Sequence, residues 1–252
     1  MTAAARSAIH VRGLRKSYGK QVVLDGIDLD VAVGSVFALL GPNGAGKTTA
    51  IQILTTLIPA DGGEVEVGGF DVFRQADAVR HQIGVTGQVS AVDGQFTGEE
   101  NLRLMADLLH LGRVEGRRRV SELLERFDLA DAAGKPAATY SGGMRRRLDL
   151  AMTLVGEPRI IFLDEPTTGL DPRSRRETWA IVRELVAGGT TVLLTTQHLE
   201  EAEALADRIG VLDRGRLIAH GTAGELKDLV PGAADLDDVF LALTGASTEV
   251  LA

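Results

Sequence analysis

The chain has 252 residues, of which 44% are hydrophobic, and a formal net charge of -8 at pH 7. The length suffices for one large core or a domain with a subdomain, and the apolar content supports a folded globule. The negative charge counts against nucleic acid as the main partner, because phosphate backbones favour an excess of Lys and Arg. The absence of cysteine excludes disulfides, thiolate metal sites and thiol nucleophiles.

The N-terminal residues and the lengths of the apolar runs indicate where in the cell the protein is expected. Residues 1–7 lack the apolar core of a signal peptide, so we expect a cytosolic address. No apolar run approaches the roughly 18 to 20 residues that span a bilayer, so any membrane role would be carried by another chain.

Short apolar runs that read as strands alternate with helix-like segments, which predicts an α/β sheet. These runs occupy residues 9–11, 36–40, 160–163 and 191–194. Trp179 falls at helical spacing with Val182 and Val186, so we expect it to pack in the core.

A phosphate-binding pattern, G-x-x-x-x-G-K-[ST], occupies residues 41–48 directly after an apolar strand. Gly44 and Gly46 allow consecutive backbone N–H groups to curl around an anion, which a Cβ would obstruct. Lys47 adds a positive charge near the β and γ phosphates, and Thr48 offers a hydroxyl to Mg²⁺. Because a helix N-terminus also attracts anions, this segment predicts that the chain binds a nucleoside triphosphate.

Residues 90–155 have a different sequence pattern, in which apolar side chains recur at intervals of three and four residues, as in amphipathic helices. Two such sets are Leu102, Met105, Ala106 and Leu109, and Val120, Leu123, Leu124 and Phe127. We therefore expect a helical insert with two amphipathic helices. Its arginine runs at 117–119 and 145–147 are interpreted as solvated faces, with contact to a partner as the alternative.

Within this insert, Ser141 is followed by Gly142 and Gly143 at a helix start, which predicts a second anion-binding segment. Two anion-binding loops in one chain are unexpected if both bind the same nucleotide. We infer that the second loop of one chain completes the site of another chain. This predicts a head-to-tail dimer with ATP between the subunits.

Two adjacent carboxylates, Asp164 and Glu165, follow an apolar strand at the end where sheets of this type bind ligands. Neighbouring strand residues point to opposite sides, so the two carboxylates can divide the work. We interpret Asp164 as the group that holds Mg²⁺ or its water, and Glu165 as the general base for the attacking water.

These motifs, in this order, resemble those of ATP-binding cassette (ABC) ATPases, the nucleotide-binding subunits of ABC transporters, over about residues 8–245. The resemblance implies a phosphate-loop NTPase core with a mainly parallel sheet, an antiparallel β region and an inserted α-helical subdomain. The implied single ABC ATPase domain spans 1–252, with a nucleotide-binding core (1–89 and 156–221), a helical subdomain with the signature motif (90–155) and a helical C-terminal tail (222–252).

The resemblance also assigns roles to single residues. It places Gln88 near Mg²⁺ and the attacking water, relaying nucleotide state to a membrane domain, and makes His198 the switch histidine that donates to the γ phosphate. Tyr18 is expected to stack on adenine. Asp171 belongs to the loop that crosses the dimer interface, and it can also cap a helix before Pro172.

The implied residue sets are as follows. The nucleotide-binding set is Tyr18, Gly41, Asn43, Gly44, Gly46, Lys47, Thr48, Thr49, Gln88, Ser141, Gly142, Gly143 and Asp171. The catalytic set is Glu165, His198 and Lys47, and the set for Mg²⁺ is Thr48, Gln88 and Asp164.

The signature differs from the commonest family wording in having Tyr140 for Leu and Met144 for Gln. With residues 145–148, 195–201 and 236–245, this variant resembles the daunorubicin/doxorubicin-resistance branch of bacterial exporters. The resemblance implies that an ATP-dependent homodimer powers export of a drug or lipid-like substrate through a separate multi-span membrane subunit. The chain is then expected at the cytoplasmic side of the cell membrane, with no nucleic-acid partner.

Two alternative interpretations stay open at this stage. The first is a soluble cassette ATPase that acts on ribosomes, DNA or cofactor assembly; the single cassette and the lack of sustained heptads between residues 48 and 141 disfavour it. The second is a phosphate-loop kinase or GTPase. The Ser-Gly-Gly segment at 141–143 and the absence of a guanine-reading Asn-Lys-x-Asp pattern argue against it.

Overall fold

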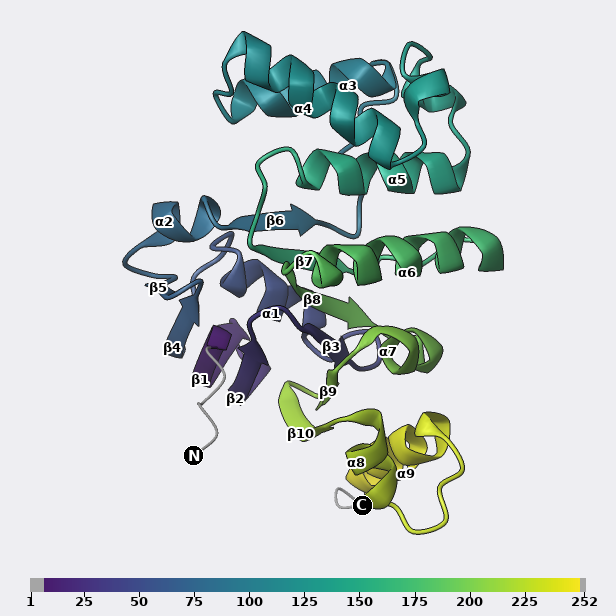
Figure 1. The fold of residues 1–252 in the computed structure, drawn as a ribbon. Coiled ribbons are helices and arrows are strands. Elements are labelled where there is room, and N and C mark those ends of the chain that lie inside the picture. The colour runs from purple at the N-terminus through teal and green to yellow at the C-terminus, as the bar shows by residue number, and fades with distance from the viewer. Residues whose placement is uncertain (1–6, 250–252) are drawn as a thin grey trace, which may run out of the picture.

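Two β-sheets organise the fold, and the predicted α/β class with parallel and antiparallel regions is confirmed (Figure 1). The computed structural model describes residues 7–249; residues 1–6 of the signal-peptide expectation and 250–252 of the expected tail lie outside the described residues. The four-stranded antiparallel sheet has the order β2-β1-β4-β5. Its strands are β1 (Ser7–Tyr18), β2 (Gln21–Ala32), β4 (Gly62–Val67) and β5 (Phe70–Asp71).

The six-stranded sheet, of order β10-β9-β3-β8-β7-β6, is parallel except for its antiparallel edge strand β10. Its strands are β3 (Val36–Leu40), β6 (Ile83–Thr86), β7 (Ile160–Asp164), β8 (Thr191–Thr196), β9 (Arg208–Asp213) and β10 (Arg216–Gly221). Every residue of β3, β7 and β8 is buried, as expected for parallel strands covered on both faces. The carboxyl ends of these three strands meet at one edge, which positions the site.

Side chains alternate between two hydrophobic cores on the two faces of the six-stranded sheet. On one face, Leu39, Phe162 and Leu193 pack with residues of α1 and of the antiparallel sheet. On the other face, Leu163 and Leu194 pack with residues of the helices. The helices are α1 (Lys47–Leu54), α2 (Ala76–Arg80), α3 (Gly98–Leu108), α4 (Arg113–Arg126), α5 (Gly142–Thr153), α6 (Pro172–Ala187), α7 (Leu199–Leu205), α8 (Ala223–Asp228) and α9 (Leu236–Glu249).

None of the helices described between residues 7 and 249 is long and apolar enough to cross a membrane.

The described chain between β6 and β7 forms helices and no named strand, and α3, α4 and α5 lie together beyond the β6 edge of the sheet (Figure 1). Thr97 starts α3 with a capping box, in which its hydroxyl accepts from the Glu100 N–H while the Glu100 carboxylate accepts from the Thr97 N–H. The expected apolar faces are confirmed, with one exception. Leu109 is exposed, because α3 ends at Leu108 and the chain turns at His110 with φ 55°.

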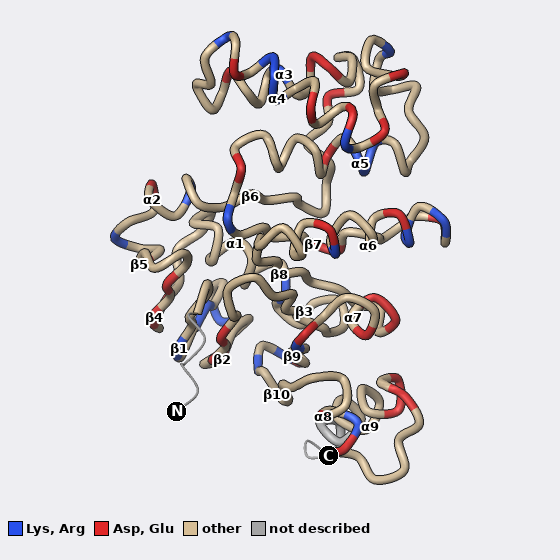
Figure 2. Tube along the Cα trace, in the orientation of Figure 1, with Lys and Arg blue, Asp and Glu red and all other residues tan. Residues whose placement is uncertain are grey.

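The interpretation of the arginine runs as solvated faces is wrong for three residues. Arg119 is buried and donates to the Leu154 carbonyl oxygen at 2.8 Å. Arg147 is mostly buried and donates to the Phe127 carbonyl and the Asp128 carboxylate. Arg146 pairs with buried Asp149 on the same helix, in the basic stretch of α5 that is blue in Figure 2. Arg119 and Arg147 therefore join α4 and α5, whereas Arg146 is paired within α5.

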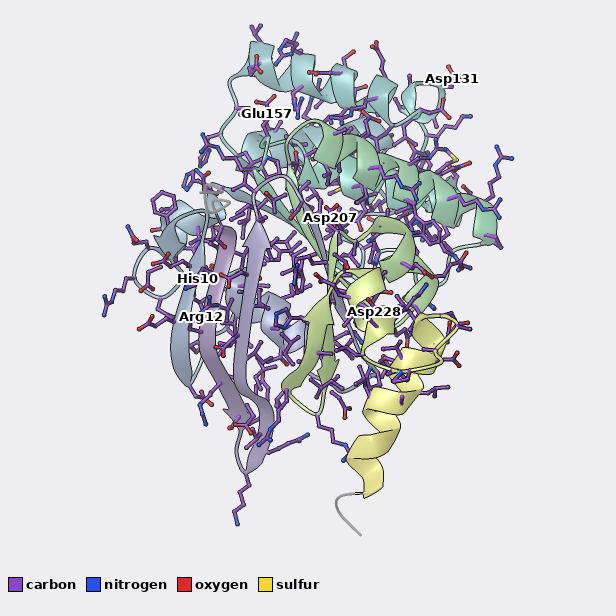
Figure 3. The ribbon with its side chains drawn as sticks, turned by 60° about the horizontal axis from the view of Figure 1, so that its bottom comes forward. His10, Arg12, Asp131, Glu157, Asp207 and Asp228 are labelled. Carbon is purple, nitrogen blue, oxygen red and sulfur yellow. The ribbon has the colours of Figure 1, made fainter. Side chains whose placement is uncertain are left out.

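Charged side chains also join strands. His10 and Arg12 of β1, labelled in Figure 3, both contact the Asp30 carboxylate of the neighbouring strand β2. Burial acts to raise the pKa of Asp30, but hydrogen bonds from Arg12 and His10 outweigh it and lower that pKa. Asp207, also labelled in Figure 3, accepts from the Val36 N–H at 2.8 Å and so ties the start of β3 to the chain that leads into β9.

Candidate nucleotide-binding and hydrolysis site

The phosphate loop connects β3 to α1, which begins at Lys47. Gly46 precedes the helix with φ 108°, a left-handed conformation that glycine adopts readily. A Cβ on Gly46 would lie 2.7 Å from Leu24 Cδ2 and 2.8 Å from the Val23 carbonyl oxygen. The loop therefore rests directly on the backbone of β2, which no other residue type at position 46 would permit.

Lys47 occupies the centre of this loop and is almost fully buried. Its Nζ donates to the carbonyl oxygens of Gly41 at 2.8 Å and Pro42 at 3.1 Å. The same Nζ lies 3.3 Å from Glu165 Oε1. A buried ammonium needs such partners, because an unpaired charge in the interior is very costly.

Glu165 follows β7 with φ 50°, unusual for a residue with a side chain, so the chain turns sharply at the strand end. Its N–H donates to the Thr195 carbonyl oxygen at 3.1 Å, and its Oε2 accepts from Thr168 Oγ1 at 3.1 Å. Asp164, one residue earlier, is buried and accepts from Thr195 Oγ1 at 2.5 Å. The two carboxylates thus face different surroundings, as the strand alternation predicts.

A cavity of about 320 Å³ lies in front of Lys47 and Glu165. It brings together nine residues that the sequence predicts for the site and two that it does not, Gln21 and Val23. The nine are Tyr18, Asn43, Gly44, Gly46, Lys47, Thr48, Thr49, Gln88 and Glu165. Gln21 and Val23 belong to β2, and their only sequence signal is their nearness to Tyr18 in a hairpin. Half-exposed Tyr18 has Lys16 Nζ 5.5 Å from its ring centroid.

Gly41 and Asp164 are also predicted for the site, but neither lines the cavity. A Cβ on Gly41 would lie 2.3 Å from the Leu212 carbonyl oxygen, so glycine is required for the loop to pass β9. Asp164 does not line the cavity, and its role toward Mg²⁺ stays a prediction.

His198 lies outside the lining of this cavity. It is the residue before α7; its N–H donates to Thr196 Oγ1 at 2.9 Å, and its carbonyl oxygen accepts from Glu201 N–H at 3.1 Å. In β8, Leu194 packs on the helix face and Leu193 on the α1 face. If the alternation continued past Thr196, His198 would fall on the helix face and Gln197 on the α1 face. The switch role of His198 therefore stays a prediction, with Gln197 as its neighbouring competitor.

The second anion-binding segment also lies outside that cavity. Ser141 caps α5 by accepting from the Met144 N–H at 3.2 Å. A Cβ on Gly143 would lie 2.6 Å from Ser174 Oγ, so the starts of α5 and α6 touch. Asp171 caps α6, accepting from the N–H groups of Arg173 at 2.9 Å and Ser174 at 3.0 Å. None of Ser141, Gly142, Gly143 and Asp171 lines the Lys47 cavity of its own chain, and Gly142 lines a neighbouring cavity with Gln88 and Glu165.

The sequence and the fold match known proteins. A family model described as ABC transporter matches residues 24–168. The chain is 58% identical to the daunorubicin resistance ATP-binding protein DrrA3 of Streptomyces coeruleorubidus, covering 96% of this chain and 76% of that protein. This chain belongs to the ABC transporter ATP-binding subunits.

Other members of the ABC family share less of the sequence. The daunorubicin/doxorubicin resistance ATP-binding protein DrrA of Streptomyces peucetius is 55% identical, over 87% of this chain and 67% of that protein. The Nod factor export ATP-binding protein I of Ralstonia nicotianae is 44% identical, over 86% of this chain and 68% of that protein. A solved ATP binding subunit of an ABC transporter superposes with a TM-score of 0.83 at 30% identity, covering 94% of this chain and all of that one. The chain is therefore an ABC-type ATPase that binds ATP.

Proposed function

We propose that this ABC ATPase hydrolyses ATP in a head-to-tail dimer to drive export of a drug or lipid-like molecule through a separate membrane subunit. The observation that carries the proposal is the 58% identity, over 96% of the chain, to a daunorubicin resistance ATP-binding protein. The cavity around Lys47 supplies the chemistry, since its lining joins the phosphate loop to a carboxylate suited to act on water.

In the proposed hydrolysis, the γ phosphate takes the place that Glu165 now holds beside Lys47. Glu165 then accepts a proton from water while the water oxygen bonds to the γ phosphorus and the bond to the ADP oxygen breaks. Gln88, which shares the cavity with Glu165, orients that water. Thr168 donates at 3.1 Å to Glu165 Oε2, the oxygen that does not face Lys47, and so would retain the carboxylate at the loop when Oε1 is displaced from Lys47.

The proposed Mg²⁺ ligands are a hydroxyl, an amide oxygen and a carboxylate, supplied by Thr48, Gln88 and Asp164. This oxygen set fits Mg²⁺, which is usually bound through one or two carboxylates together with phosphates and water. Residues 7–249 contain no group of three His, Asp or Glu side chains that could hold a metal ion. When bound with ATP, Mg²⁺ would neutralise charge on the β and γ phosphates.

The proposed dimer follows from the separation of the two anion-binding segments. Ser141 and Gly142 are exposed at the start of α5, and neither lines the Lys47 cavity of its own chain. In a head-to-tail pair, each Ser141 segment would meet the γ phosphate bound by the other chain.

The proposed membrane subunit would dock in a second cavity, of about 490 Å³, between β6, α3 and α5. Its lining is apolar at Val85, Met105 and Leu108 and basic at Arg80. Leu108 is 63% exposed, which leaves an apolar surface for a partner to cover. Val85 lies three residues before Gln88, so a segment docked here would respond to the nucleotide. These features support attachment of the chain to the cytoplasmic side of the membrane.

Purification of the tagged chain from gently solubilised native membranes tests the proposal. We expect a multi-span membrane protein to co-elute in comparable amount, and Leu108→Glu to lose that protein while retaining ATP binding. Recovery of ribosomal or other soluble proteins alone would contradict the transport function and favour a soluble cassette ATPase.

A further inference from the structure

A buried ion pair on α5 holds the chain segment that follows Gln88. Arg146 Nη1 lies 3.1 Å from Asp149 Oδ2, with the two side chains 11% and 3% exposed. Asp149 Oδ1 accepts from the Ala91 N–H at 3.2 Å. The position of the Gln88 loop is therefore tied to α5 through Asp149.

A second buried carboxylate, Glu201, holds the chain segment that follows Glu165. Glu201 lies in the first turn of α7 and has no exposed surface. Its Oε1 accepts from Thr167 Oγ1 at 2.8 Å and from Trp179 Nε1 at 3.2 Å. Thr167 comes two residues after Glu165. The carboxylate thus links α6 and α7 to the hydrolysis loop, and Trp179 does more than the core packing expected of it.

The Arg146 guanidinium and the Glu201 carboxylate, which carry opposite charges, each have buried polar atoms that make no hydrogen bond. Arg146 Nε and Nη2 are buried without a hydrogen-bond partner, and so is Glu201 Oε2. Burial lowers the pKa of Arg146, while the charges of Asp149 and Glu201 act in the opposite direction. Arg146 lines a cavity together with Pro166 and Thr168, the two neighbours of Thr167, whose hydroxyl donates to Glu201. The guanidinium and the Glu201 carboxylate thus flank the same segment, and no hydrogen bond joins them. Leaving such groups unsatisfied is costly, which favours any movement that pairs them.

A cavity of about 180 Å³ lies between Arg146 and the hydrolysis site. Its lining includes Gln88, Arg146, Asp149, Glu165 and Thr168, so it separates the α5 side from the Glu165 side. A nucleotide bound between Gln88 and Glu165 contacts both sides and would draw them together. The segments that move are the ones that Asp149 and Glu201 hold.

We propose that Arg146 is a positioning residue that closes onto Glu201 when ATP is bound, joining the Gln88 loop to the Glu165 loop through Asp149, Arg146 and Glu201. This inference rests on the proposed function. In the structure described here the link is complete on the Asp149 side and open on the Glu201 side. The closed link would fix the water-orienting amide and the general base relative to each other.

A double-mutant cycle on the full chain tests the pair, in a Glu165→Gln parent that retains ATP. The variants are Arg146→Met, Glu201→Gln and the two together, and ATP affinity is measured for each. We expect each single change to weaken ATP binding about tenfold, the scale of a hydrogen bond to a charged group, and the double change to weaken it no further. Without nucleotide, the coupling between the two changes, measured on the free energy of unfolding, should be smaller than the coupling measured on ATP binding.

Trp179 is the only tryptophan of the chain and donates to Glu201, so its fluorescence reports on the same carboxylate. ATP should change Trp179 emission in the parent and in Arg146→Lys, which keeps the charge, but not in Arg146→Met. Arg147→Met is the matched control, because Arg147 pairs with Asp128 between α4 and α5. It should leave both the ATP affinity and the emission change intact.

Three results would overturn the inference. Additive effects on ATP affinity would mean that no pair forms with nucleotide, and equal coupling with and without nucleotide would mean a permanent contact. An unchanged Trp179 response in Arg146→Met would exclude a role for the guanidinium at Glu201. Failure of the Glu165→Gln parent itself to bind ATP would instead contradict the proposed function, and this inference with it.

Discussion

Lys47 Nζ and Glu165 Oε1 lie 3.3 Å apart, with side chains only 5% and 8% exposed, so the phosphate-binding cation and the proposed general base neutralise each other. This pairing places the ammonium beside the carboxylate at the position where the terminal phosphate would be bound. In the proposed mechanism, ATP therefore displaces Glu165 from Lys47 before Glu165 acts on water.

The first prediction concerns Glu165→Gln. We expect this variant to bind ATP at least as tightly as the wild type, because it removes the anion that competes for Lys47. Turnover should fall by about 10²- to 10⁴-fold, the range attributed to a general base. Equilibrium binding and steady-state hydrolysis check both expectations, with Lys47→Ala as the control that should lose binding. Near-normal hydrolysis by Glu165→Gln would contradict the assignment.

Tyr18 provides a second prediction, since its ring lines the cavity and is half exposed. Stacking of a base on an aromatic ring contributes about 1–3 kcal/mol, so Tyr18→Ala should weaken ATP binding by roughly 5- to 150-fold. Tyr18→Phe keeps the ring and should bind ATP like the wild type. Equal ATP affinity in the alanine and phenylalanine variants would show that the ring does not contact the base.

The residue of the β8 loop that contacts the terminal phosphate can be identified with a matched pair of variants. Because His198 starts α7 and lies outside the cavity, we expect Gln197→Ala to slow ATP hydrolysis more than His198→Ala. The rates are compared at saturating ATP, so that differences in affinity do not contribute. A greater loss in His198→Ala would support the switch histidine implied by the family resemblance.

Asp171 gives a pH-dependent prediction. Hydrogen bonds from the Ser174 hydroxyl and N–H and from the Arg173 N–H lower the pKa of Asp171. A carboxylate whose pKa is lower in the folded state stabilises the fold above its unfolded pKa of about 3.9, and this contribution is lost as the pH falls through the folded pKa. Asp171→Asn keeps the cap but does not titrate. The stability difference between wild type and Asp171→Asn, measured by thermal unfolding, should therefore shrink in acid below about pH 4. A constant difference would contradict the role of the carboxylate charge.

The sequence predicts the parts of the site that depend on neighbouring residues. The phosphate loop, the strand that ends at Asp164 and the face of α4 all arise from local patterns, and each is present. Gln21 and Val23 could not be predicted in the same way. They reach the cavity because the β1–β2 hairpin lies over the phosphate loop, which is a tertiary contact.

The arginine runs also show that contacts between residues distant in the chain cannot be predicted from local sequence. On a helix, residues 145–147 have the composition of a solvated face, and local sequence contains nothing to contradict that interpretation. Arg147 is instead mostly buried and donates to the Phe127 carbonyl and the Asp128 carboxylate, and Arg146 is mostly buried beside Asp149, which accepts from the Ala91 N–H. The contacts of Arg147 with Phe127 and Asp128, and of Asp149 with Ala91, join residues distant in the chain, so the periodicity of α5 alone could not reveal them.

Gly215, in the turn between β9 and β10, also bears on the choice of ligand. Its N–H donates to the Ala45 carbonyl oxygen, its carbonyl oxygen accepts from the Asp25 N–H, and a Cβ there would lie 2.4 Å from the Val23 carbonyl oxygen. The turn thus fastens the phosphate loop to the strand that follows Tyr18. The spacing between Tyr18 and Lys47 is thus fixed by backbone contacts. If these residues bind the base and the terminal phosphate as proposed, that spacing would favour a ligand of matching length.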